Sequence, residues 1–295
     1  MGRRALGRSG LTLVELLVAL TVTTIAGAAL IKVMLAQNRA SGTNEAWRVA
    51  RAVSRGSLNR LLADLSIAEA EGALDGLTVD GRDITLRVPY AIGVACNTTL
   101  PLAATMLPVD DAQWSAARFA GFAWRDNSTS AYRYRTASFS GATIFSPGTG
   151  SVCSAAGIAT LPASAGFGTP GRVVNLNAGT IGGGTPSIGM NVFVYQQVRY
   201  RFAPSAALPG QVALWRQVLN GGSDEELAAP FDSTARFRFY VVGSDVAQGS
   251  VPSPRSLARG IEIHLDGMSE TAPVGSTDPK RVRLTTSIFF KNRRD

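Results

Sequence analysis

The stretch that decides the fold is Leu11–Ile31, LTLVELLVALTVTTIAGAALI, which contains a single ionisable side chain, Glu15. At about 1.5 Å per residue, a helix of this length can cross the roughly 30 Å hydrocarbon core of a bilayer. Three arginines precede the stretch, whereas only Lys32 follows it directly. The positive-inside rule therefore predicts a cytoplasmic N-terminus and an exported remainder.

Two ordinary explanations compete for this stretch. One is a plain single-span anchor, and the other is a secretory signal peptide cleaved after the small-residue run 26–28, Ala-Gly-Ala. Neither explains Glu15, because a carboxylate within an apolar helix costs at least a few kcal/mol unless it is paired. Cleavage between Gly10 and Leu11 would create an α-amino group four residues before Glu15, at helical spacing. The amine of a neighbouring subunit could serve equally well.

Gly10 followed by LTLVELLVAL (11–20) resembles the class III leader junction of type IV prepilins and of type II secretion pseudopilins. The resemblance implies that a membrane prepilin peptidase cuts after Gly10 and N-methylates Leu11. It further implies that Glu15 pairs with a neighbouring subunit's N-terminal amine, so that the chain assembles with other pilins or pseudopilins through its helix. The family usually has phenylalanine at the first mature position, where this chain has Leu11.

The helical pattern continues beyond the apolar stretch. Apolar residues recur largely at spacings of three and four, with arginines between them, which is typical of an amphipathic helix. These apolar positions are Trp47, Ala50, Leu58, Leu61, Leu65 and Ala68. We therefore expect a leader (1–10), a helix (11–71) that is transmembrane over 11–31 and amphipathic over 32–71, and a β-rich globular domain (72–295).

Strand patterns follow the helix. Asp80-Gly81 predicts a hairpin turn between strands at 77–79 and 84–88, the second of which we expect to stop at Pro89. Residues 90–187 predict long loops with some short strands. Clear alternation returns over 192–202, 212–218, 237–242, 261–265 and 282–290. Strands in series without intervening helices indicate an antiparallel sheet, with one face covered by the long helix, in a pilin-like α+β fold.

A narrower resemblance covers residues 192–293. The segments that carry it are VRYR (198–201), LWR (214–216), EEL (225–227), FRFY (237–240) and FKNR (290–293). Together they resemble minor pilins of the PilW type and the related J-type minor pseudopilins. Major pilins are usually shorter, so the resemblance implies a minor, priming or tip-proximal subunit.

The two cysteines, Cys96 and Cys153, lack the CxxC spacing of zinc sites, and His264 is the only histidine. Metal and thiol catalysis are therefore disfavoured, and no cofactor is expected. In an oxidising compartment the two cysteines are candidates for a disulfide that closes a long loop, which would stabilise the fold by roughly 4 kcal/mol.

Glu262, His264 and Asp266 alternate with aliphatic residues, which places all three on one face of a strand. A metal or acid–base site is one interpretation, and the solvated face of a half-buried strand is the simpler one, because no second histidine completes a metal shell. No nucleophile elbow, Walker loop or dinucleotide glycine pattern is present, so we expect no enzyme.

The net charge of +8 admits an anionic partner, although Arg3, Arg4 and Arg8 of the leader contribute three of these charges. A second basic group alternates with aromatic residues. Its members are Arg125, Arg133 and Arg135, beside Trp124, Tyr132 and Tyr134. They could contact DNA, or their stems could lie over the aromatic rings of a strand pair.

The sequence thus predicts a minor pilin that takes part in assembly of a type IV pilus. The alternatives are a minor pseudopilin of a type II secretion system and a filament-displayed module for DNA or adhesion. We expect a single-pass protein of the inner membrane with a periplasmic globular domain, which later reaches the pilus and the cell surface.

Overall fold

The computed structural model of the chain describes residues 12–68, 74–78, 80–107, 116–128, 132–138, 151–158, 172–178 and 184–290. Its elements in chain order are α1 (Leu13–Ile67), β1 (Leu74–Leu77), β2 (Asp83–Ala95), β3 (Leu102–Met106), β4 (Phe119–Arg125), β5 (Tyr132–Ser138), α3 (Ser151–Ala155), β6 (Arg172–Ala178), β7 (Asn191–Pro204), β8 (Val212–Val218), β9 (Asp224–Phe231), β10 (Arg236–Val241), η2 (Arg255–Leu257), β11 (Ala258–Met268) and β12 (Arg281–Phe289).

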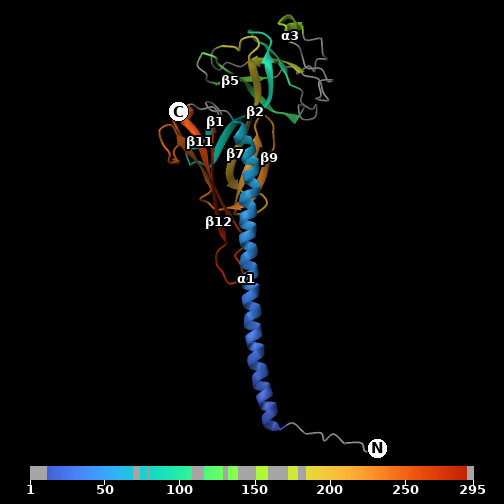
Figure 1. Cartoon of the computed structure of the whole chain (residues 1–295), viewed down its shortest axis with the longest axis vertical. Coiled ribbons are helices and arrows are strands. Elements are labelled where there is room, and N and C mark those ends of the chain that lie inside the picture. Colours follow the sequence, from blue (N-terminus) through green and yellow to red (C-terminus); the bar gives the residue numbers. More distant parts are fainter. Residues whose placement is uncertain are drawn as a thin grey trace, which may run out of the picture.

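The helix α1 is the stem of the molecule (Figure 1). Its 55 residues give a length of about 80 Å. The β-rich part lies along the upper half of α1, while the lower half stands free. The helix begins at Leu13 and ends at Ile67, a few residues before the end at 71 that the sequence predicted.

One antiparallel sheet curls around the upper half of α1. The strands beside the helix follow the order β1-β2-β7-β8-β9-β11-β10, with β12 on the other edge of β11. The core lies between helix and sheet, where Leu61 and Leu65 of α1 pack with Ile84, Phe237 and Ile263 of the strands. The predicted α+β arrangement, a long helix covering one face of an antiparallel sheet, is confirmed.

A second group of strands closes into a ring above the end of α1. β2 pairs with β3, β3 with β6, β6 with β5, β5 with β4, β4 with β7, and β7 again with β2. The ring has its own core, which includes Phe122, Trp124, Val192 and Val194. The long strands β2 and β7 therefore belong both to the sheet beside α1 and to the ring.

One of the strand boundaries expected from the sequence needs correction. Pro89 does not end its strand, because β2 continues to Ala95 and the register shifts between Pro89 and Ala91, an irregularity at which proline is tolerated. The short strands expected within residues 90–187 are present as β3 to β6, of five to seven residues each. The acidic segment around Glu225, to which no element was assigned from the sequence, belongs to β9.

The buried stripe of α1 also differs from the expected one. Trp47 is 37% exposed, whereas Ala46, Ala50 and Ser54 are buried. At these positions small side chains let the helix lie close to the strands, while Leu61 and Leu65 pack in the core.

Candidate functional site

The first turn of α1 contains a reciprocal capping box formed by Thr12 and Glu15. The Glu15 N–H donates to Thr12 Oγ1 (3.3 Å), and Glu15 Oε2 accepts from the Thr12 N–H (3.1 Å) and hydroxyl (3.2 Å). The carboxylate thus caps its own helix, a role that the sequence analysis missed although Thr-x-x-Glu is the signature of such a box.

The predicted cleavage residues Gly10 and Leu11 lie outside the described residues. The described helix begins at Leu13, with Thr12 as its N-cap.

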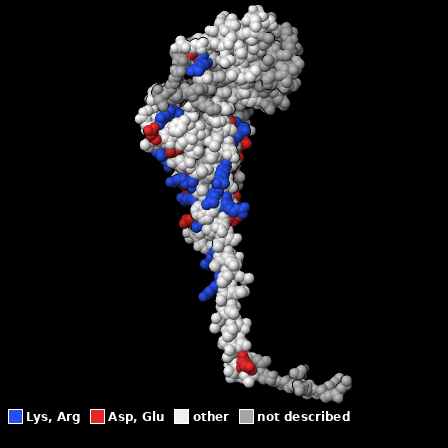
Figure 2. All heavy atoms as spheres, viewed as in Figure 1, with Lys and Arg blue, Asp and Glu red and all other residues white. Residues whose placement is uncertain are grey.

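The lower half of α1 exposes an apolar surface that the rest of the described chain does not cover. Its exposed large apolar side chains are Leu13, Val14, Leu16, Leu17, Val18, Leu20, Val22, Ile25, Leu30, Ile31, Val33, Met34 and Leu35. In Figure 2 this part of the stem is white apart from one acidic side chain near its lower end and basic side chains near its upper end. An apolar surface of this extent needs an apolar partner.

The polar residues within this surface are satisfied by the helix itself. The hydroxyls of Thr21, Thr23 and Thr24 donate to carbonyl oxygens three or four residues earlier, at 2.7–2.8 Å. Such bonds leave no hydroxyl that requires water. Within the described residues, α1 is the one helix long and apolar enough to cross a membrane.

The upper half of α1 is fixed to the sheet by a buried polar cluster of Asp64, Tyr200 and Arg216. Asp64 Oδ2 accepts from the Tyr200 hydroxyl (2.7 Å) and from Arg216 Nε (3.0 Å). The side chains of Asp64 and Arg216 are only 11% and 10% exposed. Burial and the Asp64 carboxylate raise the pKa of Tyr200. One feature of the sequence could have indicated this cluster. The acidic residue Asp64 lies between Leu61 and Leu65, within the apolar stripe of the helix.

A second contact brings the backbone of α1 close to β11. Ser54 Oγ donates to the Leu265 carbonyl oxygen (3.2 Å). Gly267 has no side chain to separate the two elements, since a Cβ there would lie 2.4 Å from the Ala50 carbonyl oxygen. Together with the Asp64 cluster, this contact holds the stem rigidly against the sheet while its lower half projects.

Cys96 and Cys153 are joined in the expected disulfide, with a Cα–Cα distance of 4.7 Å. The bridge ties α3 to the end of β2, and both cysteines are buried together with Ala103 and Val173. It fastens the segment after β5 to the ring, a connection that fits an oxidising compartment.

The hairpin of β4 and β5 separates the three arginines predicted to contact DNA. Trp124 lies opposite Arg133, and Arg125 lies opposite Tyr132. Residues directly opposite each other share a face, and side chains alternate along a strand. Trp124 belongs to the ring core, whereas Tyr132 packs in a separate cluster. Arg133 and Arg135 therefore lie on one face of the hairpin and Arg125 on the other.

Arg133 is also engaged by an acidic partner. Its Nε donates to Asp126 Oδ2 at 2.7 Å. Hydrogen bonds from the Ser128 hydroxyl and N–H, followed by the bond from Arg133, lower the pKa of Asp126 to about 2. The geometry therefore does not assemble the continuous basic and aromatic surface that DNA contact would require.

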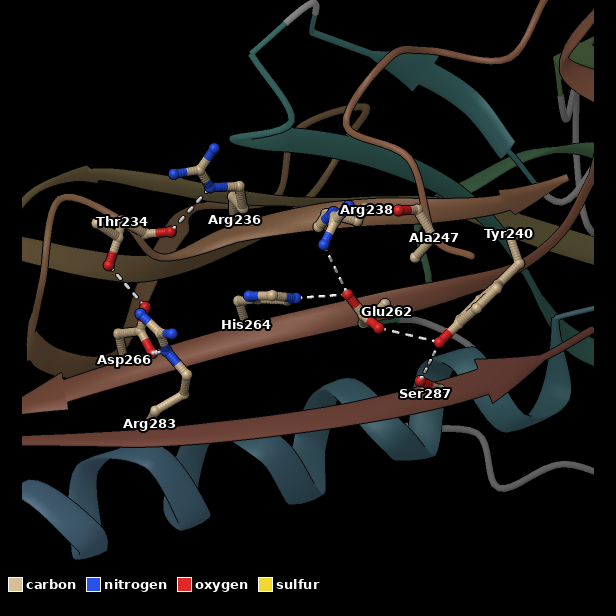
Figure 3. Close-up of polar contacts among 10 residues, drawn as sticks. All are labelled: Thr234, Arg236, Arg238, Tyr240, Ala247, Glu262, His264, Asp266, Arg283 and Ser287. Atoms are coloured by element: carbon tan, nitrogen blue, oxygen red, sulfur yellow. Dashed lines mark hydrogen bonds and ion pairs between the residues drawn. The ribbon is translucent and has the colours of Figure 1, made fainter. Parts of the chain in front are cut away.

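Glu262, His264 and Asp266 share one face of β11, as predicted, but this face is not simply solvated (Figure 3). Glu262 Oε1 accepts from Arg238 (3.5 Å) and hydrogen bonds His264 Nε2 (2.5 Å), while its Oε2 accepts from Tyr240 (2.9 Å). The Glu262 side chain is 15% exposed and that of His264 is 19% exposed. The expectation of a solvated face is therefore wrong.

The carboxylates of this network all accept hydrogen bonds from cationic or hydroxyl side chains. Asp266 accepts from Arg283 Nε (2.9 Å) and from the Thr234 hydroxyl (2.6 Å). Burial raises the pKa of Glu262, but hydrogen bonds from His264 and Tyr240 outweigh burial, so this pKa lies below its ordinary value. In the described part of the chain, no group of three His, Cys, Asp or Glu residues could hold a metal ion.

A cavity of about 560 Å³ lies beside the ring. Its walls include Pro89, Tyr90, Arg125, Tyr132 and Phe193. None of the described lining residues is a carboxylate, a histidine or a cysteine, so these walls provide no acid–base pair or nucleophile.

No protein-family model, curated protein or solved structure matches this chain. The features of the chain that bear on its function are the free apolar stem with its single carboxylate and the attachment of the β-rich part to α1.

Proposed function

We propose that this chain is a minor pilin, processed between Gly10 and Leu11 and assembled into a type IV pilus through the lower half of α1. The observation that carries the proposal is the free stem, whose exposed side chains are apolar from Leu13 to Ile31 except for Glu15 and three self-bonded threonines. Such a surface suits a bilayer before assembly and the packed helices of a filament afterwards.

The carboxylate of Glu15 supports assembly over simple anchoring. In an apolar environment a charged carboxylate needs a cation, and the capping hydrogen bonds of Thr12 supply none. A neighbouring subunit's terminal amine, created by cleavage after Gly10, would provide that cation. A plain anchor would gain nothing from this residue that glutamine could not supply.

The proposed topology places the N-terminus in the cytoplasm and the β-rich part in the periplasm. Arg3, Arg4 and Arg8 on one side of the span, against Lys32 directly on the other, favour this orientation. The disulfide of Cys96 with Cys153 supports an oxidising location for the β-rich part. We propose no catalytic role, because the acids of the β11 network are all engaged.

The experiment is to shear surface filaments from cells and to detect this chain in them by immunoblot. The proposal predicts the processed chain in the filament fraction and its absence from that fraction when the prepilin peptidase is deleted. Retention of the chain in the membrane of wild-type cells that bear normal filaments would refute the proposal.

A minor pseudopilin of a type II secretion system is the second candidate, favoured by the same free stem. Deleting the gene separates the two candidates. A minor pilin predicts lost twitching or DNA uptake with intact protein secretion, and a pseudopilin predicts lost secretion with intact pili.

A further inference from the structure

The connection between β11 and β12, residues 269–280, runs down beside α1 and forms the lowest part of the β-rich region (Figure 1). At its tip, Gly275 lies against the stem. Arg39 Nε is 3.5 Å from the position that a Cβ on Gly275 would occupy. The tip of the connection therefore lies beside Arg39 of the helix.

The tip is an ordered turn that presents an apolar corner. The Ser276 N–H donates to the Pro273 carbonyl oxygen (2.9 Å), and Gly275 has a φ of +84°. These features are typical of a type II turn, in which Val274 occupies the first corner position. Val274 is 72% exposed. The connection is closed above the turn by a bond from the Ser269 N–H to the Lys280 carbonyl oxygen (2.9 Å).

The turn lies at the level where the apolar surface of α1 ends. Leu35 is the last exposed large apolar residue of the lower stem, and Arg39 follows it after about 6 Å along the axis. The headgroup layer of a bilayer is about 5–8 Å thick on each side. If the helix is inserted up to Leu35, four residues beyond the predicted span 11–31, with the Lys32 ammonium reaching outward to the phosphates, Val274 beside Arg39 lies within the headgroup layer.

The charges at this level suit phospholipid headgroups. Lys32 and Arg39 are exposed on the stem, where their side chains can reach lipid phosphates. The connection itself carries Glu270, Asp278 and Lys280, which nearly balance. The contact therefore depends on the apolar corner at Val274 together with the two cations of the stem, and not on a strongly basic loop.

We propose that the turn 273–276 is a second membrane contact, in which Val274 enters the headgroup layer of an anionic phospholipid bilayer while the subunit waits for assembly. The contact would fix the orientation of the β-rich part relative to the membrane surface. This inference rests on the membrane insertion of α1 contained in the proposed function, and it adds a lipid-facing site outside the helix.

Val246 provides a matched control, because it is also 72% exposed. It lies at the opposite end of β11, where Arg259 donates to the Ser244 carbonyl oxygen (2.9 Å). Single cysteines in Val274→Cys and Val246→Cys can be labelled selectively with an environment-sensitive fluorophore, since the native cysteines form a disulfide. A third variant, Ala29→Cys, reports insertion of the stem.

The full-length labelled variants are reconstituted into vesicles of phosphatidylethanolamine and phosphatidylglycerol that contain nitroxide lipids. We expect headgroup nitroxides to quench the probe at 274 about twofold or more above the probe at 246, and acyl-chain nitroxides to quench the probe at 29. Equal quenching at 274 and 246, with a quenched probe at 29, would overturn the contact and leave the span intact. An unquenched probe at 29 would overturn both the span and the contact.

Discussion

Thr12 and Glu15 satisfy each other's hydrogen-bonding groups in the first turn of α1, through three bonds of 3.1 to 3.3 Å. The Glu15 side chain therefore has two roles: it caps the helix, and it carries a negative charge. The proposed function assigns assembly to the charge, and substitution can separate the two roles.

Glu15→Gln keeps an acceptor for the capping box and removes the charge. We expect the variant to insert into the membrane normally and to reach sheared filaments at about a tenth of the wild-type level or less, because the neighbouring amine loses its partner. The matched variant Thr12→Ala keeps the charge and loses the cap, at about 1 kcal/mol, and should enter filaments almost normally. Immunoblots of filament and membrane fractions measure both, after mass spectrometry has verified equal processing. Normal filament entry of Glu15→Gln together with loss of Thr12→Ala from filaments would show that assembly depends on the cap instead of the charge.

Asp64→Ala should weaken the attachment of the stem to the sheet. The substitution leaves Arg216 buried without its acidic partner, which we expect to cost about 3 kcal/mol of unfolding free energy. Glu45→Ala is the control, because its ion pair with Arg48 is exposed and should contribute less than about 0.5 kcal/mol. Urea unfolding of the detergent-solubilised chain, followed by tryptophan fluorescence, gives both values. Equal effects of the two substitutions would contradict the role of the buried cluster.

Gly267→Ala tests the close approach of α1 to β11. The new Cβ would lie 2.3 Å from Ser54 Oγ and 2.4 Å from the Ala50 carbonyl oxygen, so helix or strand must shift. We expect a loss of about 1–3 kcal/mol in the same unfolding measurement. Gly249→Ala, where the added Cβ meets nothing within 4 Å, should change stability by less than about 0.5 kcal/mol. An unchanged stability of the Gly267 variant would show that the contact is not close.

The network of Glu262 predicts a dependence of stability on pH. Because the pKa of Glu262 is lower in the folded chain, its stabilising contribution is complete above the unfolded pKa of about 4.3 and is lost as the pH falls through the folded pKa. Thermal unfolding of wild type and Glu262→Gln should therefore differ most above about pH 5 and converge in more acid solution. Glu270→Gln, in the exposed connection, is the control. A constant difference between wild type and Glu262→Gln down to pH 2 would contradict this account.

The strands that could be predicted from the sequence are those with one buried and one exposed face. In β10 and the middle of β11, phenylalanines and aliphatic residues that face the core beside α1 alternate with polar residues on the opposite face. The long helix was predictable for a similar reason, since its lower half is continuously apolar.

The strands that were missed lack this alternation. All five residues of β3 are buried and mostly small, so no period is visible in LAATM. β9 begins with exposed acids, ends with buried residues and contains Pro230. β9 pairs with β8, the strand that directly precedes it in the chain. Nothing in the local sequence of β2 or β7 indicated that they join both the sheet and the ring.

The candidate functional residues also divide into features that the local sequence predicts and features that depend on neighbouring strands. The shared face of Glu262, His264 and Asp266 follows from period two alone, but their burial depends on Arg238 and Arg283 from neighbouring strands. The separation of Arg125 from Arg133 required the register of the hairpin, which the sequence pattern did not provide.

The most direct test of the central claim is the N-terminal residue of the membrane-extracted protein, determined by intact mass and by mass spectrometry of the terminal peptide. The account predicts a chain that begins at N-methylated Leu11. A chain that begins at Met1 in cells with an active prepilin peptidase, or just after Ala28, would contradict it.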